Sequence, residues 1–160
     1  YMPSIMEAVA DLDIEVVATL NAMQLADLDK LPDNVRAIDY LPLNQLLPTC
    51  SALIHHGGIG TFASAANYRV PQLVTDFDAP VPEKYPVAAS TAAYVVSRGA
   101  GLMLDITSSP DTMRKQIALV LGDPSFQAGA ERIYEDLLAM PSPVDLVPVV
   151  ERLTVQNRSR

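Results

Sequence analysis

The feature that most constrains the fold is the segment 51–61, in which an apolar run ends in two histidines and a glycine-rich turn. The run over 52–55 is typical of a buried strand, and the residues after Gly60 have the composition of a helix. Glycine lets the backbone approach a bound group closely, and the N–H groups and positive dipole end of the next helix point toward that group. A strand, a glycine turn and a helix in this order predict an anion site, with phosphate as the favoured anion.

The adjacent histidines His55 and His56 close the predicted strand. Neighbouring side chains of a strand point to opposite faces, so both rings cannot reach one ligand. We expect His56, next to the turn, to reach the phosphate, and His55 to be a packed or hydrogen-bonded core residue. The same geometry disfavours a metal site. In addition, neither a third histidine nor a suitably spaced cysteine is present to complete a ligand set.

Strands and helices alternate along the chain. The hydrophobic periodicity and the turn residues predict strands over 14–20, 35–38, 52–55, 72–75 and 101–104, and helices over 3–11, 22–30, 43–47, 59–69, 87–98 and, in three pieces, about 109–154. Ser108 and Asp111 are the expected capping box of the first of these three pieces, and residues 76–86 are expected to form a loop. This alternation indicates an α/β protein with a Rossmann-like, doubly wound parallel sheet.

Composition limits the partners. A chain of 160 residues with 49% hydrophobic content suits a single domain with one core. A net charge of −8 with eleven scattered basic residues argues against nucleic acid or an anionic membrane as the partner. The single cysteine, Cys50, excludes an internal disulfide framework, and no apolar run has the length of a membrane span or signal peptide. A cytoplasmic location is the expectation.

The order of several motifs resembles the C-terminal, donor-binding half of GT-B glycosyltransferases, especially the bacterial erythromycin- and calicheamicin-type enzymes that decorate macrolides and related antibiotics. The motifs that carry this resemblance lie at 11–21, 31–36, 39–48, 55–61 and 70–74. It thins beyond Asp78 until 98–102. The resemblance implies that residues 1–160 form one nucleotide-sugar-binding domain. It also implies that a further strand and an acceptor-binding N-terminal domain lie outside this sequence.

Specific roles follow from this resemblance. His56, together with Gly58, Gly60 and Thr61, would contact the donor diphosphate and stabilise the charge on the leaving group without a metal. Tyr40 stands where this fold holds the nucleotide base against an aromatic face, and the backbone of Leu41 would hydrogen-bond the base edge.

Two further positions bear on the donor. Asp78 is the closest match to the acidic residue that reaches the hydroxyls of the donor sugar. Ser64 replaces a glutamate that binds the ribose hydroxyls in plant relatives; a shorter polar group there favours dTDP over UDP, and the alternative is that Ser64 is a small helix-packing residue. A competing interpretation makes Asp76 and Asp78 a divalent-cation site, but the same spacing recurs at Asp11 and Asp13, where no site is expected.

The implied function is transfer of a deoxysugar from a dTDP- or UDP-sugar to a small-molecule natural product. The general base would lie in the N-terminal half, so no catalytic residue is expected within 1–160, and this chain alone would be inactive. A homodimer and an activator protein both stay open as partners. The alternatives are a nucleotide-sugar epimerase or hydrolase of the same fold and a non-catalytic nucleotide-binding module.

Overall fold

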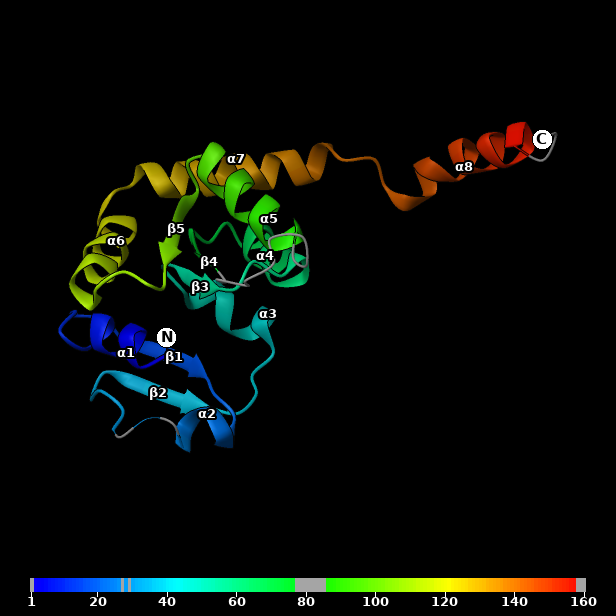
Figure 1. Cartoon of the computed structure of the whole chain (residues 1–160). Helices are drawn as coiled ribbons and strands as arrows, with labels where there is room; N and C mark the ends of the chain where they lie inside the picture. The colour runs from blue at the N-terminus through cyan, green and yellow to red at the C-terminus, as the bar shows by residue number, and fades with distance from the viewer. Residues whose placement is uncertain (1, 27, 29, 77–85, 158–160) are drawn as a thin grey trace.

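A computed structural model of the chain describes residues 2–26, 28, 30–76 and 86–157. In these residues, five strands alternate with helices, as predicted (Figure 1). The strands are β1 (Val16–Thr19), β2 (Val35–Ile38), β3 (Leu53–His55), β4 (Gln72–Asp76) and β5 (Gly101–Asp105). The helices are α1 (Met2–Ala10), α2 (Ala22–Ala26), α3 (Leu43–Leu46), the 3-10 turn η1 (Leu47–Thr49), α4 (Ile59–Asn67), α5 (Pro86–Ser97), α6 (Pro110–Gly122), α7 (Ser125–Ala139) and α8 (Pro143–Asn157).

All strand pairs are parallel, which confirms the predicted α/β class, but the described strands form two sheets instead of one. β1 pairs with β2, while β3, β4 and β5 form a sheet with β4 in the middle. In a parallel strand, successive N–H groups point to opposite edges. Val16 and Leu20 donate toward β2, so the N–H groups of Val17 and Thr19 point to the other edge, toward β3.

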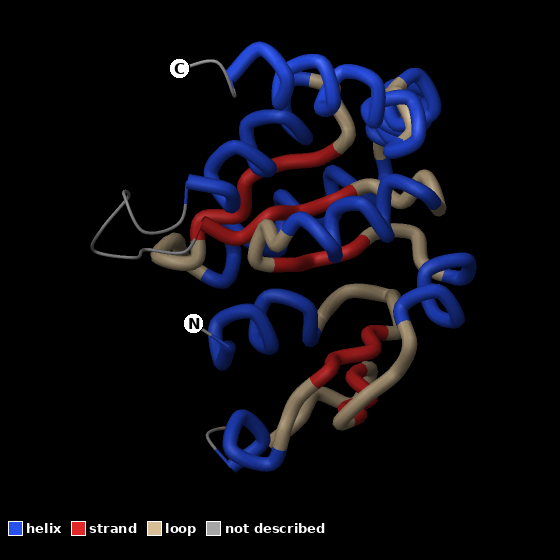
Figure 2. The backbone as a smooth tube through the Cα atoms, turned by 90° about the vertical axis from the view of Figure 1, so that its right-hand side faces the viewer, coloured by secondary structure: helices blue, strands red, loops and turns tan. Residues whose placement is uncertain are grey.

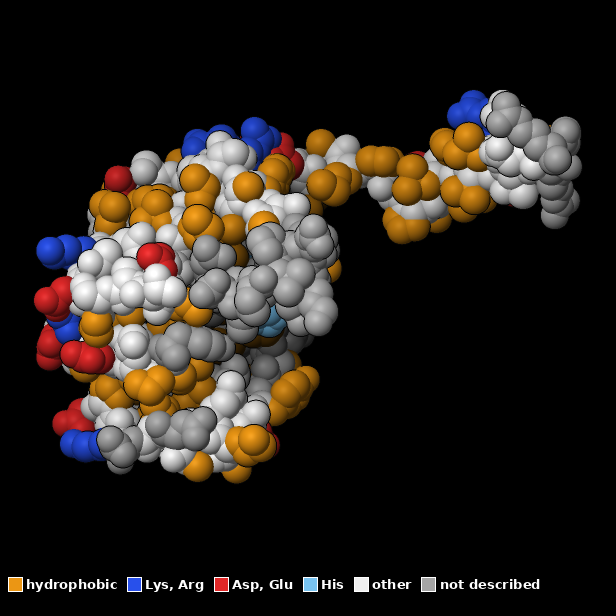
Figure 3. All heavy atoms as spheres, viewed as in Figure 1, with side chains coloured by type: hydrophobic (Ala, Val, Ile, Leu, Met, Phe, Trp, Pro, Cys, Tyr) orange, Lys and Arg blue, Asp and Glu red, His pale blue; other side chains and the backbone are white. Residues whose placement is uncertain are grey.

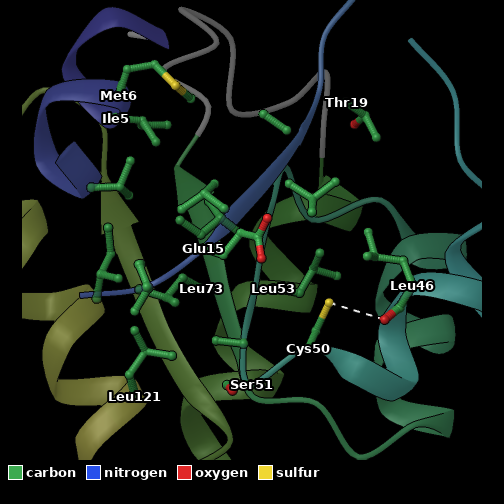
Figure 4. Close-up of a pocket in the computed structure, with 18 of the residues that line it drawn as sticks. Ile5, Met6, Glu15, Thr19, Leu46, Cys50, Ser51, Leu53, Leu73 and Leu121 are labelled. Atoms are coloured by element: carbon green, nitrogen blue, oxygen red, sulfur yellow. Dashed lines mark hydrogen bonds between the residues drawn. The ribbon is translucent and has the colours of Figure 1, made fainter. Parts of the chain in front are cut away.

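A cavity of about 700 Å³ separates the two sheets at this edge. Its walls are mostly aliphatic side chains from α1, β1, β3, β4 and α6. Figure 4 shows that Ile5, Met6, Leu53, Leu73 and Leu121 surround it. Among the described residues, β1 and β3 both line this cavity and are not paired with each other.

Helices cover both faces of the three-stranded sheet (Figure 2). Leu73 and Val74 of β4 are both fully buried although neighbouring side chains of a strand point to opposite faces. Leu73 packs in a cluster with α1 and α6, whereas Val74 packs with α4, α5 and α7. This layering is that of a doubly wound α/β sheet, and it accounts for the uninterrupted apolar character of β4.

Long-range polar contacts attach α1 to the rest of the chain. Arg114 of α6 donates to the carbonyls of Glu7 and Ala8 at 2.9 and 3.2 Å, and it forms an ion pair with Asp11 at 3.1 Å. These carbonyls belong to the last turn of α1, where a cation also complements the helix dipole. Asn34 adds three bonds from its amide nitrogen to carbonyls at the end of α1 and in the following turn.

The C-terminal helices follow the prediction with one correction. Ser109, and not Ser108, caps α6, because its hydroxyl accepts the N–H of Thr112 at 3.2 Å. Ser108 instead donates to the carbonyl of Asp105, so the helix begins one residue later than a Ser108 cap requires. α8 extends away from the body of the molecule (Figures 1 and 3). All its side chains are exposed.

Candidate functional site

A cavity of about 530 Å³ opens where β1, β2 and β3 end. Parallel α/β sheets bind ligands at the carboxyl ends of their strands. The walls combine polar and aromatic side chains from the strand ends and the loops after them, including Thr19, Asn21, Asp39, Tyr40, His56, Thr61 and Thr75. The larger cavity lies between the two sheets, whereas this smaller one lies at the strand ends and is lined by Thr61 of α4, so it is the better candidate for a ligand site.

The glycine turn leads directly into α4. Gly57 has a φ of +79°, a left-handed conformation that glycine adopts without strain. Gly58 is the N-cap residue of α4 and provides no side-chain cap for the first helical N–H groups. The position above Gly60 is open, because a Cβ built there meets nothing within 4 Å. The start of α4 therefore presents backbone donors and a positive dipole end at an accessible surface.

His56 lies beside this turn. Its side chain is exposed and lines the cavity, and a Cβ added at Gly58 would come within 3.0 Å of the His56 Nε2 atom. Thr61 in the first turn of α4 is half-buried and lines the same cavity. The structure thus brings His56, Gly58 and Thr61 together, and Gly60 lies within the same first turn of α4.

His55 is buried, as the strand alternation predicts, with 7% of its surface exposed. Its Nδ1 atom accepts the N–H of Gly57 at 3.1 Å, and its Nε2 atom is 2.9 Å from the Oε1 atom of Gln72. Burial lowers the pKa of the imidazole, since a charged ring loses its hydration there. His55 is therefore neutral and part of the support beneath the turn.

Tyr40 follows β2 and stands at the mouth of the cavity. Its side chain is 80% exposed, so it does not cap the core, and an aromatic face is accessible to a ligand. Leu41 is half-buried and lines the same wall. The two residues expected to bind the base thus lie on the same cavity as His56.

Several wall residues were not predicted from the sequence. Asn21 and Gln24 form a reciprocal cap at the start of the short helix α2, with bonds of 3.0 and 2.9 Å. Thr75 is buried and donates to the carbonyl of His55 at 3.3 Å. Asn21 lies just after β1 and Thr75 near the end of β4, and this position is the signal that could have identified them; Gln24 lies within α2 and carries no such signal.

Two sequence interpretations stay predictions. The hydroxyl of Ser64 donates to the Gly60 carbonyl at 2.8 Å, within its own helix, which agrees with a helix-packing residue and leaves the preference for dTDP over UDP untested. Asp78 lies outside the described residues, so neither its contact with the donor sugar nor the Asp76/Asp78 cation site is tested. Among the residues that are described, no three His, Cys, Asp or Glu side chains gather as a metal site would require. None of the described helices has the length and apolar character to span a membrane.

Residues 3–153 match the family described as "Erythromycin biosynthesis protein CIII-like, C-terminal domain". The chain belongs to this family. Among curated members, it is 46% identical over 156 residues to aclacinomycin-T 2-deoxy-L-fucose transferase of Streptomyces galilaeus, covering 96% of this chain and 34% of that protein. It is 42% identical over 157 residues to 10-deoxymethynolide desosaminyltransferase of Streptomyces venezuelae, covering 96% of this chain and 35% of that protein. The CIII-like domain thus spans about a third of the length of these relatives.

Solved structures agree with this assignment. Spinosyn forosaminyltransferase SpnP superposes with a TM-score of 0.77 at 39% identity, covering 96% of this chain and 38% of that one. Glycosyltransferase VinC in complex with dTDP superposes with a TM-score of 0.76 at 40% identity, covering 99% of this chain and 38% of that one. Both neighbours are GT-B glycosyltransferases, so the CIII-like domain corresponds to the C-terminal part of that fold.

Proposed function

We propose that this chain is the donor-binding domain of a glycosyltransferase that moves a deoxysugar from dTDP to a small-molecule natural product. The observation that carries the proposal is the cavity at the strand ends, bordered by the start of α4, in a chain of this family. The names of the relatives support a deoxysugar donor, and the VinC complex supports dTDP as its nucleotide.

Each part of the donor has a proposed contact. The diphosphate binds the first turn of α4, with His56, Gly58, Gly60 and Thr61 as its contacts. Backbone N–H groups aimed at the diphosphate stabilise the charge that accumulates as the bond to the anomeric carbon breaks. Because helix dipole and donors supply the positive field, we propose that binding needs no metal.

The remaining contacts hold the two ends of the donor. The base stacks on Tyr40, with the Leu41 backbone at its edge, and such stacking contributes about 1–3 kcal/mol in single-strand binders. Asp78 is proposed to bind the sugar hydroxyls. The natural-product acceptor and the general base belong to the part of the longer protein outside these 160 residues, since displacement requires both to be held near the anomeric carbon.

Calorimetry with dTDP and UDP tests the donor site. The chain should bind dTDP, and a chelator should leave the affinity unchanged; affinity that disappears with the chelator would show that a cation is required. Product assays test the reaction. Residues 1–160 should release no dTDP from a dTDP-sugar, whereas the longer enzyme should release it only with an acceptor. Release without an acceptor would favour a hydrolase, and binding without turnover by the longer protein would favour a nucleotide-binding module.

A further inference from the structure

Both ring nitrogens of His55 are engaged in a buried network directly beneath the glycine turn. Nδ1 is 3.1 Å from the Gly57 nitrogen, and Nε2 is 2.9 Å from the Gln72 Oε1 atom on the neighbouring strand β4. Gln72 is fully buried and lies opposite Leu53 of β3, two residues before His55. The network therefore joins β3, β4 and the turn that leads into α4.

These contacts determine the tautomer of His55. The Gly57 N–H can only donate, so Nδ1 must carry a lone pair, and the proton of the neutral ring is on Nε2. Nε2–H then donates to Gln72, which requires the amide oxygen of Gln72 to face the ring. With the amide turned over, two donors would face each other.

This orientation leaves the Gln72 Nε2 atom buried without a hydrogen-bond partner among the described residues. A buried amide with an unmade bond lowers stability, and an aliphatic side chain at this position would avoid that loss. The His55–Gln72 pair is therefore poorly suited to stabilising the core alone. The second effect of the pair is to hold the Gly57 N–H group through its hydrogen bond to His55.

The bond to His55 acts where the backbone changes direction. Gly57 is buried, has a φ of +79°, and is followed by Gly58, the N-cap residue of α4. Holding the Gly57 N–H on the ring sets the direction in which the next peptide groups enter the helix. The same bond restrains His56, because His56 lies in the sequence between His55 and Gly57, whose ring and N–H group the bond joins.

We propose that His55 and Gln72 are positioning residues for the diphosphate site, acting by fixing the Gly57 turn while touching no part of the donor. This inference rests on the proposed function for its ligand, dTDP. Its structural half, the anchoring of Gly57 by the Nε2–H tautomer, stands independently of any ligand.

Two substitutions at one position separate positioning from packing. In His55→Asn the side-chain oxygen takes the place of Nδ1 and keeps an acceptor for Gly57. In His55→Gln the amide reaches the place of Nε2 and keeps the contact with Gln72 but loses that acceptor. Both remove the ring, so both should lower the melting temperature by similar amounts.

The binding measurements should differ between the two variants. We expect His55→Gln to weaken dTDP binding about tenfold and His55→Asn to weaken it less than threefold. Hydrogen exchange at the Gly57 amide should be slow in the wild type and His55→Asn and at least tenfold faster in His55→Gln. Equal losses of affinity and equal Gly57 exchange in the two variants would overturn the proposal and leave His55 as a packing residue.

The wild-type protein supplies a test that requires no variant. Nitrogen NMR of His55 at neutral pH should show protonated Nε2 and bare Nδ1, and protonated Nδ1 would overturn the proposal. Failure of the wild type to bind dTDP would refute the proposed function. The Gly57 exchange rates would still decide whether His55 anchors the turn.

Discussion

Replacing His56 with alanine tests the diphosphate site most directly, because this exposed side chain lies beside the first turn of α4. A hydrogen bond between an imidazole and a charged phosphate contributes about 1.5–3 kcal/mol. Since 1.4 kcal/mol corresponds to a factor of ten, the variant should bind dTDP roughly 10- to 150-fold more weakly.

The stability of the same variant should hardly change. Substitution of an exposed residue usually alters the free energy of unfolding by less than about 0.5 kcal/mol. For a chain of this size, that is a shift in melting temperature of less than about 2 °C. His55→Ala is the matched control, because it removes a buried ring and two hydrogen bonds and should cost about 2–4 kcal/mol of stability.

Calorimetric titration with dTDP and thermal unfolding of wild type, His56→Ala and His55→Ala decide the matter. An unchanged dTDP affinity in His56→Ala would remove His56 from the site. A loss of stability in His56→Ala as large as that in His55→Ala would mean that both histidines support the core, and the reasoning from strand alternation would be wrong.

Two further predictions concern stability. Arg114→Ala should lower the free energy of unfolding by about 1–3 kcal/mol, because it leaves two carbonyls of the last turn of α1 without their donor. Arg114→Lys should restore less than half of this loss, because an ammonium group cannot reproduce the fork of guanidinium donors. Urea unfolding measures both, and an Arg114→Ala midpoint equal to that of the wild type would contradict the prediction. Burial lowers the pKa of native His55 below its ordinary value of 6.5. Between the lowered pKa and 6.5, the unfolded state therefore binds a proton that the native state does not. The contribution of His55 to stability should be full above about pH 7 and decline as the pH falls toward the lowered pKa. This decline should be absent from His55→Asn, and parallel pH profiles of stability for the two proteins would exclude His55 as its source. Hydrogen bonds from Thr107 and Arg98 lower the pKa values of Asp105 and Asp136, respectively. These two carboxylates therefore lose their contribution to stability only at more acidic pH.

Local patterns were enough to predict most elements. The apolar runs before Gly57 and around Val74 became β3 and β4, and the glycine turn leads into α4 as expected. Boundaries were less predictable. The helix expected over 22–30 ends at Ala26, and the α6 cap is one residue later than the Ser108 prediction, because neighbouring hydroxyl residues offer equivalent caps in sequence.

Part of the geometry around the candidate site was predictable. Alternation along a strand correctly separated buried His55 from exposed His56, and Tyr40 lies on the same cavity as the turn. The hydroxyl of Ser64 bonds to its own helix, as a helix-packing residue would, and the preference for dTDP over UDP stays a prediction. No sequence pattern distinguishes a serine that bonds to the preceding turn from one that faces a ligand.

The sequence by itself determined the order of the elements and their parallel class, and it predicted an anion site at the start of α4, because periodicity, glycine turns and caps act between residues close together along the chain. Only the tertiary structure decided that Gln72 holds His55 from 17 residues away and that Arg114 reaches Ala8 across 106 residues. Such partners are selected by packing, which brings together groups whose separation in sequence carries no information about their contact. The tautomer of His55 and the anchoring of Gly57 follow from that packing.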